Sequence, residues 1–183
     1  MISSWRRSAV ERGIARVAGI GVDATRISLG LISDTHGLVR PEALEALRGV
    51  DLILHAGDVG GPEVLEALRE IAPVVAVRGN NDRGAWSRRL PLRRTLDVGS
   101  ARIHLVHDAN ELDVDVERAR VRLVVSGHSH RPSVHEENGV LFVNPGSAGP
   151  RRFTLPVAVA RCDIVRDFVE ARLVHLPNRR IQR

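Results

Sequence analysis

The sequence predicts an α/β fold, a four-layer sandwich of two mixed β-sheets flanked by α-helices. Three observations support this prediction. In the first half of the chain, short apolar runs alternate with helical patterns, as in parallel strands joined by crossover helices. In the second half, strand-like runs dominate and predict a second sheet. The 183 residues are enough for one core, so a single domain is expected over residues 26–183.

Strands and helices alternate in the prediction for the first half. Continuous apolar runs at residues 27–33, 51–56 and 74–77 predict strands, because the strands of a parallel sheet are buried on both faces and need not alternate in polarity. Helical patterns lie between them, at residues 41–47 and 62–71. This order implies right-handed crossovers between parallel strands.

The second half is expected to consist mainly of strands. Strand-like runs lie at residues 93–98, 102–106, 122–125, 140–143, 157–162 and 167–176, and one helix is expected near residues 113–119. Asn138 and Gly139 form a turn dipeptide, which indicates a hairpin at that point. These strands would form a second sheet that packs on the first.

Residues 1–25 stand apart from this pattern and are interpreted as a flexible N-terminal extension. Arginines and small residues dominate the segment, and Val10, Ile14 and Val17 have helical spacing before glycines interrupt the pattern. An amphipathic helix that binds a membrane surface or a partner is the alternative interpretation.

The chain is basic, with a net charge of +5 and a pI near 11.1, and all of its basic residues are arginines. Such a chain favours anionic partners, because the guanidinium group matches phosphate geometry and a positive field attracts anions. However, the arginine pairs are scattered, and aromatic residues on which bases could stack make up only 3% of the chain. We therefore expect a small phosphate-bearing substrate, and not a nucleic acid, as the main partner.

Neither a membrane span nor a disulfide is expected. No apolar run approaches the roughly 18 to 20 residues that cross a bilayer, and the N-terminus lacks a secretory signal, so the cytoplasm is the expected compartment. Cys162 is the only cysteine and has no internal partner. Homo-oligomer formation stays open.

A polar residue follows each of five predicted strands. These residues are Asp34, Asp58, Asn80, His107 and His128. The carboxyl ends of parallel strands line one edge of a sheet, where ligands and catalytic groups collect. Segments far apart in the sequence would therefore bring oxygen and nitrogen donors to one place.

Two of these strand ends carry a second donor two residues later, in Asp34-Thr35-His36 and His128-Ser129-His130. In an extended strand, residues i and i+2 point the same way, so each pair would bind one metal or serve two adjacent metals. The whole set comprises two carboxylates, one amide and four imidazoles. This combination suits divalent transition ions better than calcium or magnesium alone.

Together, these motifs resemble those of the calcineurin-like metallophosphoesterases. The matching stretches are Asp34-Thr35-His36, Gly57-Asp58, Gly79-Asn80-Asn81-Asp82, His107 and Gly127-His128-Ser129-His130. They follow one another as in the family, and the resemblance extends over residues 27–176. The compact size and the turn from Asn144 to Ser147 are most similar to the small bacterial and archaeal phosphodiesterase branch.

The resemblance implies a phosphoesterase site with two divalent metal ions. Its donors would divide into Asp34, His36 and His130 on one ion, Asn80, His107 and His128 on the other, and Asp58 bridging both. Asn80 and Arg83 are the expected contacts to the substrate. Manganese is the expected metal, with nickel, zinc, iron and magnesium as alternatives. The paired ions would activate a shared water for attack on phosphorus.

Two departures from the family pattern affect the expected chemistry. Many relatives carry a histidine thought to protonate the leaving group where this chain has Asn81, and an asparagine cannot act as a general acid. The catalytic acid is therefore unassigned, and good leaving groups should be favoured. Asp108 follows His107 where the family usually has glycine, and it either supports a ligand or crowds the site.

We expect an enzyme that hydrolyses phosphodiesters rather than monoesters. The alternative is a non-catalytic scaffold for protein–protein interaction, as in the retromer subunit that resembles the family. The complete set of donors favours the enzyme. The other histidines, His55, His104, His135 and His175, are interpreted as core or surface residues, and the turn from Asn144 to Ser147 as structural.

Overall fold

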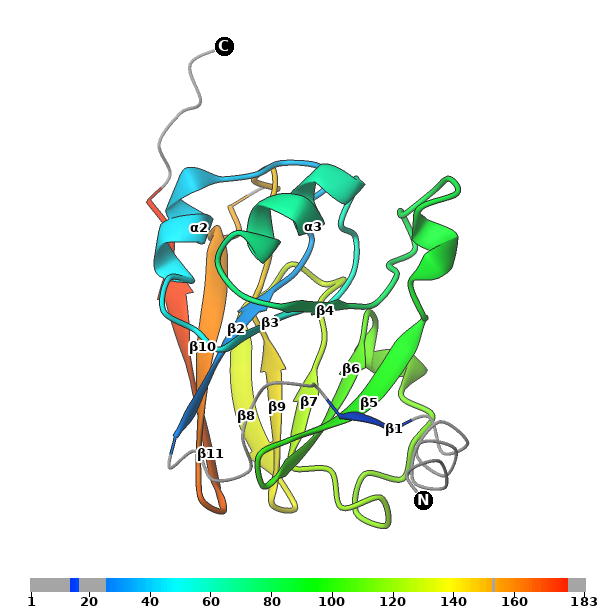
Figure 1. Ribbon diagram of the computed structural model, residues 1–183, viewed down its shortest axis with the longest axis vertical. Helices are drawn as coiled ribbons and strands as arrows, with labels where there is room; N and C mark the ends of the chain where they lie inside the picture. The colour runs from blue at the N-terminus through cyan, green and yellow to red at the C-terminus, as the bar shows by residue number, and fades with distance from the viewer. Residues whose placement is uncertain (1–13, 17–25, 153, 178–183) are drawn as a thin grey trace, which may run out of the picture.

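Two β-sheets pack face to face in the computed structural model, which describes residues 14–16, 26–152 and 154–177 (Figure 1). Helices cover the outer face of one sheet. The predicted α/β sandwich of two mixed sheets is therefore confirmed. No helix in the described part of the chain is long and apolar enough to cross a membrane.

The five-stranded sheet has the order β11-β10-β2-β3-β4. Its parallel strands are β2 (Ile27–Ile32), β3 (Leu52–His55) and β4 (Val74–Ala76). The antiparallel hairpin of β10 (Ala158–Val165) and β11 (Phe168–His175) joins the sheet along β2. All these strands lie where the sequence predicts them, to within a few residues.

Two helices connect the parallel strands, α2 (Pro41–Ala46) and α3 (Pro62–Arg69). Each begins on a proline, whose fixed φ suits the first helical turn and whose missing N–H costs nothing there. Val64, Leu65 and Leu68 form the buried side of α3. They pack with residues of α2 and the outer face of the sheet, and this contact holds the crossovers against it.

The six-stranded sheet has the order β1-β5-β6-β7-β9-β8. Its strands are β1 (Ile14–Arg16), β5 (Arg93–Val98), β6 (Ala101–Val106), β7 (Leu123–Val125), β8 (Ser133–Glu137) and β9 (Val140–Asn144). Strands β6, β7 and β9 are parallel, while β5–β6 and β8–β9 are hairpins. The expected turn joins β8 to β9, with positive φ at both Asn138 and Gly139.

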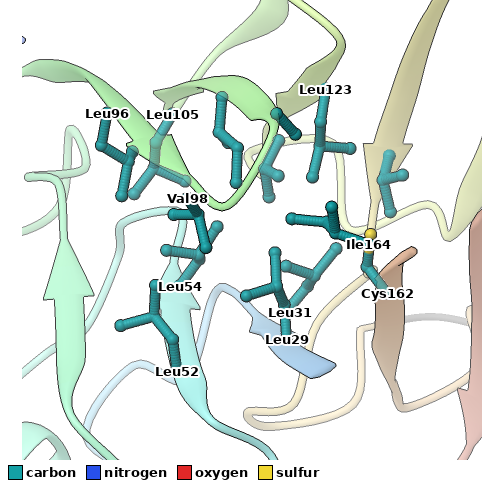
Figure 2. Packing of buried hydrophobic residues seen from close by; sticks show 14 of the residues in the cluster. Leu29, Leu31, Leu52, Leu54, Leu96, Val98, Leu105, Leu123, Cys162 and Ile164 are labelled. Carbon is teal, nitrogen blue, oxygen red and sulfur yellow. The ribbon is translucent and has the colours of Figure 1, made fainter. Parts of the chain in front are cut away.

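The main core lies between the two sheets (Figure 2). Leu29, Leu31 and Leu54 point inward from one sheet, and Leu105 and Leu123 meet them from the other. Cys162 belongs to this core and is fully buried, and burial raises the pKa of its thiol to about 12. The apolar runs of the sequence thus face each other across the sandwich.

The helix expected at residues 113–119 is wrong. A short 3₁₀ helix, η2 (Ala109–Glu111), precedes this segment, which itself contains only one isolated turn, in which Asp115 O accepts from Ala119 N. Arg120 has a positive φ of 56° and ends that turn, so the helical pattern cannot propagate. The segment still covers the outer face of the six-stranded sheet, because Leu112 and Val116 pack on Val124.

Strand β8 was predicted only indirectly, through the hairpin turn, because all five of its residues are exposed and it has no apolar run. The N-terminal extension expected over residues 1–25 lies largely outside the described residues. Within that segment, residues 14–16 form β1, which pairs in parallel with β5 at the edge of the sheet.

Candidate metal centre

Three of the predicted donors form a first cluster at the ends of β2 and β7. The Nε2 atoms of His36 and His130 lie 3.3 Å apart, and His130 Nε2 lies 3.2 Å from Asp34 Oδ1. One ligand atom from each of these residues falls within 4.8 Å of the others. This geometry could hold a single divalent ion with mixed oxygen and nitrogen ligands.

A second cluster adjoins the first at the ends of β3, β4 and β6. Ligand atoms of Asp34, Asp58 and His107 lie within 4.8 Å of one another. Asn80 Oδ1 lies 2.9 Å from His107 Nε2 and 3.2 Å from His128 Nδ1. The structure thus brings together all seven predicted donors.

Asp58 lies between the two clusters. Its Oδ2 atom is 3.8 Å from His36 Nε2 and 3.5 Å from His107 Nε2. Burial alone would raise the pKa of this carboxyl, but the nearby His107 ring and the hydrogen bonds from Asn81 outweigh burial and lower the pKa well below its usual range. The carboxylate is therefore held as an anion, and it is nearly inaccessible to solvent.

Asn81 holds Asp58 in this position with two donors. Its backbone N–H donates to Oδ1 at 2.8 Å, and its side-chain Nδ2 donates to Oδ2 at 2.6 Å. Asn81 stands where many relatives carry the histidine thought to protonate the leaving group. Its side chain is therefore directed at Asp58.

The tautomer of His107 is fixed for ligand binding. Its Nδ1–H donates to Ala56 O at 2.7 Å, so the lone pair of the neutral ring lies on Nε2, which faces Asn80 Oδ1. A backbone carbonyl commonly orients metal-binding histidines in this way. Burial lowers the pKa of His107, but the contacts with Asp58 and Ala56 raise it more, so the net shift is upward.

The surroundings of the fully buried Asp34 indicate whether a cation fits the site. Its Oδ2 accepts from His128 N at 3.0 Å, whereas Oδ1 is buried and accepts no hydrogen bond within the described structure. An unpaired carboxylate oxygen is costly in a protein interior. Asp34 Oδ1 lies beside the ring nitrogen of His130, and a cation bound between these two atoms would stabilise the carboxylate. The residues present therefore fit a metal ion.

Five of the seven donors have left-handed backbone conformations. Positive φ values occur at Asp34 (53°), His36 (47°), Asp58 (52°), His128 (64°) and His130 (58°). Non-glycine residues rarely adopt this region, and such strain concentrates at functional sites. The expectation that each donor pair continues an extended strand is therefore wrong, because β2 ends at Ile32 and β7 at Val125. Each pair converges because its loop is bent.

Two glycines allow the loops to approach closely. A Cβ on Gly79 would collide with the backbone N and Oδ1 of Asp58, and a Cβ on Gly127 would collide with Ser33 Oγ. Only glycine fits at such contacts. Gly79 and Gly127 therefore bring the Asn80 and His128 loops against the two aspartates.

His55, which the sequence pattern presents as an ordinary core or surface histidine, is a buried residue that supports the site. Its Nδ1 accepts from Gly57 N at 3.2 Å, so Nε2 carries the proton and donates to Thr35 Oγ1 at 2.9 Å. Thr35 in turn donates to Val59 O at 2.8 Å. Burial lowers the pKa of His55 to about 4, which keeps the ring neutral in this network.

Asp82 is a second residue that supports the site, and the sequence pattern does not indicate this role. One of its carboxylate oxygens accepts from Gly60 N and the other from Gly79 N, both at 2.8 Å. The side chain therefore joins the loop after Asp58 to the loop that carries Asn80.

The turn from Asn144 to Ser147 is structural, as expected, and it braces the site. Asn144 Nδ2 donates to Gly127 O at 2.6 Å and to Ser129 Oγ at 3.1 Å. Ser147 Oγ donates to Asp34 O at 2.8 Å. The remaining histidines lie elsewhere: His104 contacts Thr95, His135 stacks on Phe142, and His175 is exposed.

The surroundings of the two clusters differ in charge. Asp108 Oδ2 lies 3.6 Å from His128 Nε2, and its Oδ1 caps η2 by accepting from Asn110 N. Asp108 therefore lies beside this predicted ligand, and together with Glu111 and Arg78 it lines an adjoining cavity of about 320 Å³. Arg152 Nη2 lies 3.4 Å from His36 Nε2 at the other cluster. Arg83 is exposed, and its side chain forms no hydrogen bond or ion pair with the site residues in the described part of the chain.

Comparisons with known proteins agree with the motifs. The calcineurin-like phosphoesterase superfamily domain matches residues 27–167. A probable metallophosphoesterase of Methanothermobacter thermautotrophicus is 38% identical over 148 residues, which are 74% of this chain and 86% of the relative.

Two solved structures share the fold at low sequence identity. An archaeal phosphodiesterase aligns with a TM-score of 0.69 at 22% identity, over 82% of this chain and all of its own (100%). Vacuolar Protein Sorting 29 from Cryptosporidium parvum aligns with a TM-score of 0.67 at 22% identity, over 83% of this chain and 98% of its own. The family match and the archaeal relative confirm the resemblance, and the chain belongs to the calcineurin-like phosphoesterase superfamily.

Proposed function

We propose that this protein is a phosphodiesterase that depends on two divalent metal ions, with manganese the first candidate. Asp34, His36 and His130 would hold one ion, Asn80, His107 and His128 the other, and Asp58 would bridge them. Bound there, the ions would polarise a phosphoryl oxygen and activate water for in-line attack.

The position of Asp58 is the observation that carries the proposal. The same oxygen faces a histidine of each cluster, at 3.8 Å from His36 and 3.5 Å from His107. A carboxylate can span two ions, whereas an imidazole nitrogen can serve only one. The anionic state of Asp58 and its two hydrogen bonds from Asn81 support its role as the shared ligand.

The cavity beside the second cluster supports a diester as substrate. About 320 Å³ is available next to Asn80 and His128, enough for a second ester substituent. The carboxylates of Asp82, Asp108 and Glu111 and the single guanidinium of Arg78 line this cavity, and their net negative charge would repel a further phosphate or carboxylate group there. We therefore expect a small diester whose organic group is neutral or cationic. The archaeal phosphodiesterase that shares the fold agrees with this choice.

The role of Asn81 supports a preference for good leaving groups. Because both of its donors contact Asp58, Asn81 offers no proton to a departing alkoxide. A positioned acid is worth roughly 10² to 10⁴ in rate for a basic leaving group, and little for a nitrophenolate. We therefore expect rates that depend steeply on the pKa of the leaving alcohol.

The test is a metal-reconstitution assay. Metal-free protein is prepared with a chelator, checked by elemental analysis, and loaded separately with Mn²⁺, Ni²⁺, Zn²⁺, Fe²⁺ or Mg²⁺. Hydrolysis of bis(p-nitrophenyl) phosphate and of p-nitrophenyl phosphate is then compared. We expect activity only after loading, and a higher kcat/KM for the diester. Full activity in verified metal-free protein would contradict the mechanism. Absence of hydrolysis with every metal, although metal binds, would favour the non-catalytic scaffold, a role consistent with the fold shared with Vacuolar Protein Sorting 29.

A further inference from the structure

Arg152 lies at the mouth of the first cluster. Its Nη2 atom is 3.4 Å from His36 Nε2, and that nitrogen faces the interior of the site, since it is 3.3 Å from His130 Nε2 and 3.8 Å from Asp58 Oδ2. The arginine itself is exposed to solvent. A guanidinium group therefore stands where an incoming anion meets the donors.

The segment that carries Arg152 is fixed to the site by its backbone. Gly149 N donates to Asp34 O at 3.1 Å. Arg40, which is buried, donates from Nε to Ala148 O at 3.3 Å and from Nη2 to Gly149 O at 3.0 Å. These bonds place the chain just before Arg152 against the Asp34 loop. The approach of Arg152 to His36 is thus built into the fold.

The neighbouring Arg151 is directed elsewhere. Its Nε donates to Leu155 O at 3.2 Å and its Nη2 to Thr154 O at 3.4 Å, so its guanidinium closes a local turn. Two adjacent arginines of equal charge therefore have different surroundings, and only Arg152 contacts a site residue.

We propose that Arg152 binds a non-bridging phosphoryl oxygen of the substrate, an inference that rests on the proposed phosphoesterase function. Once the His36 lone pair is committed to a metal ion, the guanidinium donors of Arg152 are left for an oxygen anion. A guanidinium makes short, paired, charge-assisted hydrogen bonds to phosphate. Arg152 thus takes the role that the sequence pattern suggested for Arg83.

The charge distribution around the site orients the substrate in the same sense. Arg152 lies at the His36 side, whereas the His128 side has the carboxylates of Asp108 and Glu111, which outnumber the one guanidinium there, that of Arg78. Phosphoryl oxygens are attracted to the first side and repelled from the second. The ester substituent therefore occupies the acidic cavity, with the phosphoryl group between the two.

The experiment compares Arg152→Ala, Arg152→Lys and the matched control Arg151→Ala with the natural protein, all loaded with Mn²⁺. Manganese content, affinity for inorganic phosphate by calorimetry, and kcat and KM for bis(p-nitrophenyl) phosphate are measured. Arg152→Ala should lower phosphate affinity and kcat/KM by about 10- to 100-fold, because a charge-assisted hydrogen bond to the phosphoryl oxygen is lost. Manganese content should be unchanged, because Arg152 is not a ligand.

The two remaining variants separate charge from geometry. Arg152→Lys keeps the charge without the planar fork and should recover part of the loss. Arg151→Ala should stay within about twofold of the natural protein, since its side chain faces away from the site. Equal losses in Arg151→Ala and Arg152→Ala, or a loss of manganese in Arg152→Ala, would overturn the inference in favour of a role in holding the segment.

The outcomes also separate this inference from the proposed function. If the natural protein hydrolyses the diester and Arg152→Ala matches it in kcat/KM and phosphate affinity, the inference fails while the function stands. If the loaded natural protein hydrolyses no ester but binds phosphate, and Arg152→Ala weakens that binding at least tenfold, the function fails and the anion contact stands.

Discussion

Replacing Asp82 by alanine should destabilise the fold through the two loops that this side chain joins. Its carboxylate accepts from Gly79 N, in a buried hydrogen bond, and from Gly60 N, in a partly exposed one, both at 2.8 Å. Losing the buried bond strands an N–H without an acceptor, which costs about 1.5 to 3 kcal/mol. Water can reach the other N–H, so its loss adds roughly 1 kcal/mol or less.

The expected total is therefore about 1.5 to 4 kcal/mol, a large part of the 5 to 15 kcal/mol that stabilises typical domains. Urea unfolding followed by circular dichroism measures this value, and with a slope of about 2 kcal/mol per M the midpoint should fall by roughly 0.8 to 2 M. Metal content should fall as well, because Asp58 and Asn80 lie on the two loops that separate. Asp82→Asn keeps the shape but retains only one acceptor, so it should lie between the natural protein and Asp82→Ala.

Asp115→Ala is the matched control. Asp115 also accepts from a backbone N–H, that of Arg118 at 2.9 Å, but this bond is exposed to solvent. Its loss should cost less than about 1 kcal/mol and leave metal content unchanged. Indistinguishable urea midpoints for Asp82→Ala and Asp115→Ala would refute the argument, because they would mean that burial of the Gly79 N–H adds nothing.

Four further predictions follow from individual residues. Asp58→Ala should bind fewer than two ions per chain and lose nearly all hydrolysis, measured by elemental analysis and steady-state kinetics; two retained ions with normal turnover would contradict its bridging role. Because burial lowers the pKa of His55 from 6.5 to about 4, the unfolded chain binds more protons than the folded one between these values. Stability should therefore fall as pH drops through that window, and His55→Gln should flatten the fall in urea titrations. Cys162 should resist alkylation at pH 8 until urea unfolds the protein, because its thiol is buried and its pKa is about 12; rapid labelling of folded protein would disprove this. Removing residues 1–25 should leave the urea midpoint and metal content nearly unchanged, since β1 is a three-residue edge strand and the segment holds no predicted donor; insoluble truncated protein would indicate a docked segment.

The pattern of apolar residues was sufficient to predict the strands that are buried on both faces. The runs at β2 and β3 are apolar on both faces because one face meets the other sheet and the other meets α2 and α3. The same reasoning failed at residues 113–119, where Val116 and Ala119 have helical spacing but only one turn forms. Spacing shows which side chains can be buried together, but it does not show how far backbone hydrogen bonding continues.

The sequence by itself determined the family, the sandwich fold and the seven candidate donors, because each donor follows a strand whose apolar run is readable. The tertiary structure alone decided how those donors meet. Left-handed bends at Asp34, Asp58 and His128 depend on loops that approach through Gly79 and Gly127, and no local pattern encodes such contacts.

The supporting residues were equally hidden in the sequence. Asp82 joins two loops, and Arg152 reaches His36 across 116 positions of the chain. A charged side chain in a loop has the same appearance in sequence whether water or a buried N–H is its partner. Only the packing of distant segments brings Asp82 to its buried N–H, away from water, and brings the exposed Arg152 beside His36.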